Sequence, residues 1–108
     1  LARLDPGGDA MAMMEICVVP LGTGSTSLSA YVAEVVRELA ASGLEYELGP
    51  MSTVVVGELD DLLAVARRMH ERPFAMGALR VATTIRIDDR RDKPLSIRGK
   101  VRAVQEKL

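Results

Sequence analysis

The order in which two hydrophobic periodicities alternate along the chain restricts its fold more than any other feature. A period of two residues indicates a strand, and a period near 3.6 residues indicates a helix. Strand-like patterns occupy residues 14–21, 44–48, 52–58 and 80–88, and helix-like patterns occupy residues 28–39 and 59–69. The chain is therefore predicted to run β-α-β-β-α-β.

Turn-forming residues support these boundaries. The loop Gly22–Ser27 consists of small residues and ends in hydroxyl side chains suited to cap a helix. Gly43 is a typical helix C-terminal stop, and Gly49 with Pro50 joins the second and third strands closely enough for a hairpin. Pro73 is predicted to kink or end the second helix.

This order is the split β-α-β pattern of an α+β, ferredoxin-like sandwich with a four-stranded antiparallel sheet. An additional C-terminal helix is predicted after Ser96, from apolar residues at helical spacing: Ile97, Val101, Val104 and Leu108. Both crossing helices cover the same sheet face. Strands 14–21 and 52–58 are too apolar to leave the other face in water, so we expect a second copy to cover it, giving a homodimer or a tetramer built as a dimer of dimers.

The 108 residues suffice for one domain. Residues 1–12 show no sustained period and contain Pro6, Gly7 and Gly8. We expect residues 1–12 to be a disordered leader or tag and residues 13–108 to form the single ferredoxin-like domain.

Composition disfavours several classes of function. Fourteen basic and fifteen acidic residues give a net charge of −1, which provides no field for nucleic acid, and the three aromatic residues form no stacking platform. No stretch has the roughly 20 apolar residues needed to cross a membrane. The single Cys17 allows no intrachain disulfide and fits a cytoplasmic protein. His70 lacks neighbours at metal-ligand spacing, so no metal and no cofactor is expected.

Two segments are candidate sites. The backbone amides and hydroxyls of Gly22–Ser27 suit a phosphate or a polar heterocycle, although helix capping explains the same residues and the spacing matches neither a P-loop nor a dinucleotide fingerprint. Tyr31 lies on the following helix, where it either closes that site or packs in the core. The charged run Asp88–Asp92 is either a solvated turn or an interface whose ion pairs involve Arg86, Arg90 and Arg91.

Four segments taken together resemble the YkoF-like thiamine-binding protein family: GTGSTSLSAYVA (22–33), TVVVGE (53–58), RVATTIRIDDRRD (80–92) and GKVRAV (99–104). The resemblance implies ferredoxin-like subunits, dimers formed sheet to sheet, often tetramers, and binding of thiamine or a related pyrimidine without catalysis. Two positions depart from the family pattern: Val56 replaces a frequent glutamate, and Met51-Ser52-Thr53 replaces Met-Gly-Thr.

Such a ligand has a flat aminopyrimidine that requires apolar walls with a few hydrogen-bonding groups, and a thiazolium cation that requires an acidic or aromatic neighbour. The predicted hydrogen-bonding residues are Ser25, Thr26, Ser27, Tyr31, Ser52, Thr53 and Thr83. Asp88 is the predicted acidic neighbour of the cation.

The leading interpretation is a carrier or sensor of thiamine or hydroxymethylpyrimidine. The alternative is an oligomeric structural or regulatory module that binds no small molecule. A third possibility, an enzyme using Tyr31, His70 or Asp88 for proton transfer, is disfavoured because no nucleophile or acid–base motif accompanies them.

Overall fold

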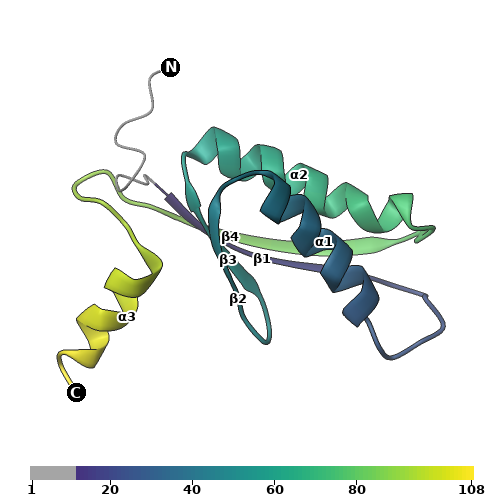
Figure 1. Ribbon diagram of the computed structural model, residues 1–108, viewed down its shortest axis with the longest axis horizontal. Helices are drawn as coiled ribbons and strands as arrows, with labels where there is room; N and C mark the ends of the chain where they lie inside the picture. The colour runs from purple at the N-terminus through teal and green to yellow at the C-terminus, as the bar shows by residue number, and fades with distance from the viewer. Residues whose placement is uncertain (1–11) are drawn as a thin grey trace.

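A computed structural model describes residues 12–108 and contains a four-stranded sheet and three helices (Figure 1). The elements are β1 (Ala12–Pro20), α1 (Ser29–Ala41), β2 (Glu45–Leu48), β3 (Thr53–Gly57), α2 (Leu59–Ala75), β4 (Val81–Asp89) and α3 (Ile97–Gln105). The sheet order is β2-β3-β1-β4 with every pair antiparallel. This confirms the predicted α+β, ferredoxin-like fold with its additional C-terminal helix.

The core lies between one face of the sheet and the helices α1 and α2. Alternate residues of β1 point to this face, so Ala12, Met14 and Ile16 are almost completely buried, as is Val55 of β3. The helices contribute their apolar sides: Val35 and Leu39 from α1, and Leu62, Val65, Ala66 and Met69 from α2. The helical periodicity of the sequence therefore corresponds to one continuous core.

The two neighbours of β1 pair with it over different lengths. Pairing with β3 runs from Ala12 to Ile16, which lies opposite Thr53. Pairing with β4 continues to Pro20, which lies opposite Val81. Residues 17–20 therefore have a strand neighbour on the β4 side, whereas the β3 ladder has already ended on the other side.

The sheet face opposite the core, called the open face below, mixes apolar and charged residues. From the strand registers it carries Met13, Glu15, Cys17, Val19, Glu45, Glu47, Val54, Val56, Ala82, Thr84, Arg86 and Asp88. Val56 is 5% exposed although it lies outside the main core cluster, whereas Glu45, Glu47 and Arg86 are exposed.

Two local expectations differ from the structure. The N-cap of α1 is Leu28, which makes no side-chain cap hydrogen bond; the Ser25 hydroxyl instead accepts the Ser27 N–H at 3.1 Å, within the loop. Of the two alternatives expected for Pro73, a kink or an end of the helix, the end is wrong, because α2 continues to Ala75. The Pro73 ring is buried, and its carbonyl accepts the N–H groups of Met76 and Ala78, both at 3.0 Å, which closes the helix end.

The predicted boundary between leader and domain falls one residue after the start of β1. Ala12 is completely buried in that strand, so residue 12 belongs to the described fold together with residues 13–108. Residues 1–11 lie outside the described part of the chain, and the predicted leader remains a prediction there.

Candidate functional site

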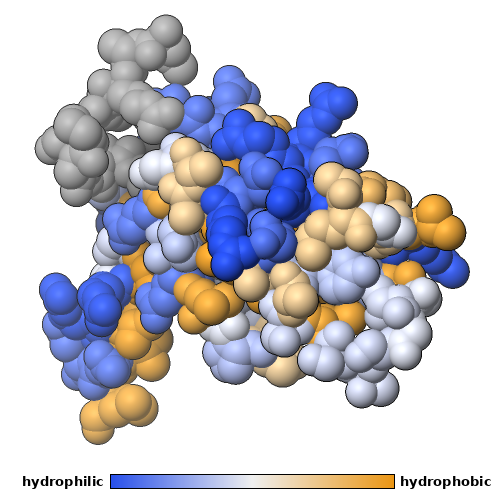
Figure 2. Space-filling view, turned by 45° about the vertical axis from the view of Figure 1, so that its right-hand side comes forward, coloured by the Kyte–Doolittle hydropathy of each residue, from blue (hydrophilic) through white to orange (hydrophobic). Residues whose placement is uncertain are grey.

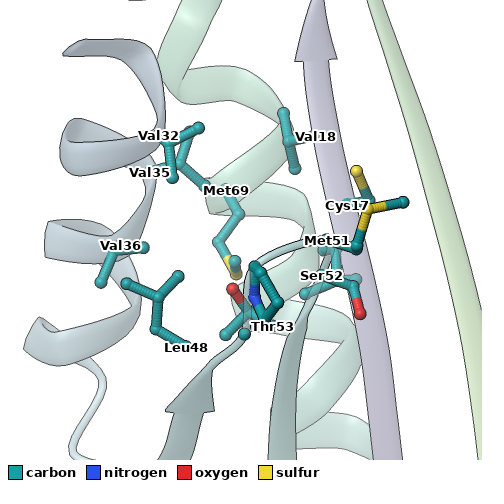
Figure 3. Close-up of a pocket in the computed structure, with 13 residues that line it drawn as sticks. Cys17, Val18, Val32, Val35, Val36, Leu48, Met51, Ser52, Thr53 and Met69 are labelled. Atoms are coloured by element: carbon teal, nitrogen blue, oxygen red, sulfur yellow. The ribbon is translucent and has the colours of Figure 1, made fainter. Parts of the chain in front are cut away.

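A cavity of about 100 Å³ opens between α1 and the end of the sheet where β3 begins (Figure 3). Its walls come from β1 (Ile16, Cys17, Val18), α1 (Val32, Val35, Val36), the β2–β3 hairpin (Leu48, Gly49, Pro50, Met51, Ser52, Thr53) and α2 (Met69). The cavity follows from the unequal strand pairing, because the hairpin turns away where β1 continues. Residues of four separate parts of the fold thus meet around one small space.

Most of the wall is apolar, and Thr53 is the main exception. Thr53 is 6% exposed and is the buried polar residue among those described. Its side chain makes no hydrogen bond with another described residue. Among the described residues Arg72 Nε is the fully buried side-chain atom without a partner, so the Thr53 hydroxyl is still accessible and can form a hydrogen bond with a ligand bound in the cavity.

The free edge of β1 supplies further polar groups beside this wall. Cys17 and Val18 line the cavity on the side where the β3 ladder has ended. An exposed strand edge presents backbone N–H and C=O groups that accept a new hydrogen-bonding neighbour. The cavity therefore combines apolar walls with a polar strand edge, which suits a flat ring carrying donors and acceptors on its rim.

A carboxylate lies next to the cavity through Ser52. The Ser52 hydroxyl donates to Glu15 Oε2 at 3.0 Å, and Arg86 Nε lies 3.7 Å from Glu15 Oε1. The side chain of Glu15 is 44% exposed and that of Arg86 is 82% exposed. This carboxylate is therefore partly balanced by Arg86 and remains accessible on the open face.

The structure brings two of the predicted ligand residues, Ser52 and Thr53, to the cavity. Ser25, Thr26 and Ser27 are exposed in the loop before α1, where hydroxyl and backbone groups bond to one another. Tyr31 is half-buried on α1, one residue before the lining residue Val32. Neither the loop nor Tyr31 forms part of the cavity wall.

Thr83 and Asp88 lie elsewhere. Thr83 is on β4, separated from the cavity by β1, and its Oγ1 is 2.7 Å from Nδ1 of His70. Asp88 lies on the open face and pairs with Lys100 of α3. Both side chains already have partners within the chain.

The other two arginines predicted at an interface are engaged in the turn after β4. Arg90 makes two hydrogen bonds to Asp92, both at 2.6 Å, and this lowers the pKa of Asp92 to about 2. Arg91 binds Asp89 at 2.9 Å, and this hydrogen bond lowers the pKa of Asp89. Arg90 and Arg91 are therefore paired with carboxylates of the same charged run. Arg86 is the most exposed of the three predicted interface arginines.

Sequence reasoning missed Glu15 and the walls from α1. Glu15 is the one charged residue in an otherwise apolar strand, and a single charge in such a strand indicates a candidate functional residue. Val32, Val35 and Val36 were recognised only as a helical stripe, because a periodic pattern does not show where a core is incomplete.

Neither a metal-holding cluster nor a membrane-spanning helix is found within residues 12–108. No group of three or more histidine, cysteine, aspartate or glutamate side chains is placed to hold a metal ion. No helix in this part of the chain is long and apolar enough to cross a membrane.

The fold and cavity define a ferredoxin-like domain with a small apolar recess, and comparison with known proteins identifies its family. A family model described as thiamine-binding protein matches residues 14–105, so the chain belongs to the thiamine-binding protein family. It is 46% identical over 102 residues to the UPF0045 protein YqgV of Bacillus subtilis, covering 91% of this chain and 98% of that protein.

Two solved structures are also similar. The hypothetical protein MJ1052 of Methanocaldococcus jannaschii has a TM-score of 0.80 at 32% identity, covering 88% of this chain and 96% of that one. A domain of unknown function from Bacillus cereus has a TM-score of 0.78 at 30% identity, covering 94% and 95%. These similarities extend over nearly the whole described domain.

Proposed function

We propose that this chain binds thiamine, or its hydroxymethylpyrimidine part, as a non-catalytic carrier or sensor, in the cavity between α1 and the β1–β3 end of the sheet. The observation that carries the proposal is Thr53, a largely buried residue that lines the cavity beside the free edge of β1 and whose accessible hydroxyl has no partner among the described residues. Membership of the thiamine-binding protein family supplies the ligand class.

The cavity volume fits one ring better than a whole ligand. Pockets that enclose a drug-sized molecule have roughly 300 Å³ or more, whereas this one has about 100 Å³. We therefore assign the cavity to the aminopyrimidine, with Val18, Val36 and Met69 as walls and Thr53 as a hydrogen-bonding partner. The thiazolium would then lie outside, near Ser52 and Glu15.

The lining chemistry supports binding rather than turnover. None of the described residues that line the cavity is an acid, a histidine, a lysine or an arginine. General acid–base catalysis requires a titratable group within hydrogen-bond reach of the substrate. His70, the histidine of the chain, bonds instead to Thr83 on the far side of β1.

We further propose that copies assemble through the open face, as a dimer or a dimer of dimers. Its central residues Met13, Cys17, Val19 and Val54 are only half-buried within one chain, and covering such apolar area favours association. Exposed Arg86 lies on this face and is the predicted interface arginine that this geometry supports best.

Titration calorimetry with thiamine and, separately, hydroxymethylpyrimidine tests the ligand. We expect saturable binding of both, in the micromolar range or tighter. Thr53→Val keeps the shape but removes the hydroxyl, so affinity for both ligands should fall about tenfold through one lost buried hydrogen bond. Absence of heat and of a thermal shift with both ligands would overturn the proposal and favour an interaction module without a ligand.

A second variant tests where the cation lies. Glu15→Gln should weaken thiamine binding a few-fold, because a partly exposed carboxylate contributes roughly 1 kcal/mol or less, and should leave neutral hydroxymethylpyrimidine unaffected. Asp88→Asn is the matched control on the same sheet face, and we expect no change. The reverse result, in which Asp88→Asn weakens thiamine binding and Glu15→Gln has no effect on it, would assign the cation to Asp88 instead.

A further inference from the structure

The C-terminal helix α3 is attached to the domain at its beginning and projects from it over the rest of its length (Figure 1). Leu95, just before the helix, is 5% exposed, and Ser96 accepts the Gly99 N–H at 2.9 Å as a side-chain cap. Lys100 pairs with Asp88 of β4. Beyond this point no residue of α3 is buried.

An isolated helix of nine residues is unstable in water, because nucleation costs more than so few hydrogen bonds return. An apolar stripe on this helix and just after its end is also exposed: Val101 is 53%, Val104 is 60% and Leu108, three residues beyond the helix, is 99% exposed. Figure 2 shows the helix at the lower left, with hydrophobic surface beside hydrophilic surface. Both observations indicate that something else covers the stripe.

The charges around the stripe indicate what covers it. Residues 97–108 hold four basic side chains and one acidic side chain, and neither Arg98 nor Arg102 forms an ion pair with a described residue. The edge strand β2 has the opposite character, because Glu45 and Glu47 are exposed on the open face and are likewise without ion pairs there. The same chain thus carries an unpaired basic surface and an unpaired acidic one.

The two surfaces do not satisfy each other within one chain. Glu47 and the α3 residues Arg98 and Arg102 border a common open space of about 200 Å³ without making an ion pair. Lys100 ties α3 to Asp88 at the other edge of the same sheet, and in this position Arg98 and Arg102 form no ion pair with Glu47. In a two-fold dimer each copy can offer both surfaces reciprocally, so two helices and two acidic strands are matched at once.

We propose that α3 is an arm that binds a second copy of this chain. The stripe of Val101, Val104 and Leu108 packs on the second copy, while Arg98 and Arg102 pair with the acidic β2 of that copy. The arm also covers the free edge of β2, which would otherwise offer unpaired backbone groups. This proposal rests on the open-face assembly proposed above and extends it to a segment outside the sheet.

The first test compares two adjacent residues of α3 without any ligand. Val104→Glu places a charge in the stripe, and Ala103→Glu places the same charge on the opposite side of the helix. Sedimentation velocity of the full chain should show that Val104→Glu weakens assembly about tenfold or more, while Ala103→Glu assembles like the parent. Equal behaviour of the two variants, or a parent chain that is monomeric at every concentration, would overturn the proposal.

A charge exchange tests whether the contact joins two copies. One chain carries Glu45→Lys and Glu47→Lys, and the other carries Arg98→Glu and Arg102→Glu. Each alone opposes like charges and should dissociate, whereas an equal mixture restores both contacts and should form heterodimers. Failure of the mixture to assemble, with recovery when all four changes are placed in one chain, would place the contact within a chain and overturn the proposal.

Two further measurements separate the arm from its alternatives. Val54→Arg charges the centre of the open face; if it dissociates the protein and Val104→Glu does not, the open-face assembly stands and the arm proposal fails. A basic amphipathic helix can also bind anionic membranes. Cosedimentation of the parent with phosphatidylserine vesicles, lost in Val104→Glu while self-association is unchanged, would assign the stripe to a lipid surface and overturn the proposal.

Discussion

Val36→Phe is expected to lower the affinity for thiamine and for hydroxymethylpyrimidine by roughly a hundredfold, equivalent to about 2.7 kcal/mol. Val36 lines the cavity from α1 and is only half-buried (Figure 3). A phenyl ring at this position occupies a space of about 100 Å³ that we assign to the aminopyrimidine. Valine and phenylalanine have similar helix propensities, so α1 should form as before. Calorimetric titration of both ligands measures the change.

Val36→Ala is the matched control for this prediction. It removes wall atoms instead of adding them, so the ring site is enlarged and binding should persist with a loss of no more than about tenfold. Thermal unfolding of both variants without ligand verifies that each is folded. If Val36→Phe binds both ligands like the parent, the ligand site lies outside this cavity.

The predicted order of strands and helices is confirmed because each element has a clear hydrophobic period. The cavity was harder to foresee, because it depends on where pairing stops. Period-2 patterns show which residues share a face, but they do not show that the β3 ladder ends at Ile16 while the β4 ladder continues to Pro20. That difference in length exposes the edge of β1 and creates the site.

The hydroxyl-rich loop illustrates a second limit of sequence reasoning. Ser25 and Ser27 have the residue types of a helix cap and of a polar binding loop, and both uses appeared open in the sequence. The hydroxyl of Ser25 instead accepts the Ser27 N–H within the loop. Local backbone geometry determines this hydrogen bond, and the residue types alone do not specify it. Thr53, in contrast, was identified as a ligand candidate, and its burial at the cavity follows from its place at the first position of β3.

The helix α3 shows the same distinction between an element and its surroundings. Its start was predicted from Ser96, and the structure confirms that cap. Its apolar spacing was equally clear, yet the stripe remains exposed in the single chain. Amphipathic spacing predicts that a helix has a partner surface and does not specify whether that surface belongs to the same chain.

Leu62→Ala is expected to lower the free energy of unfolding by about 3 kcal/mol, within the range for fully buried leucines. Leu62 is 0% exposed and joins α2 to the core. Leu63→Ala is the matched control, since Leu63 is the next residue of the same helix and is 47% exposed. Alanine favours the helix at least as well as leucine, so the difference between the variants reports burial alone.

Urea unfolding followed by circular dichroism, at a fixed subunit concentration, measures both variants. A fixed concentration is needed because self-association adds to the apparent stability. We expect Leu63→Ala to lose no more than about 1 kcal/mol. Equal losses would mean that Leu63 is covered as well as Leu62, which would place the exposed side of α2 in an interface between copies, whereas a small loss for both would contradict the core packing described for α2.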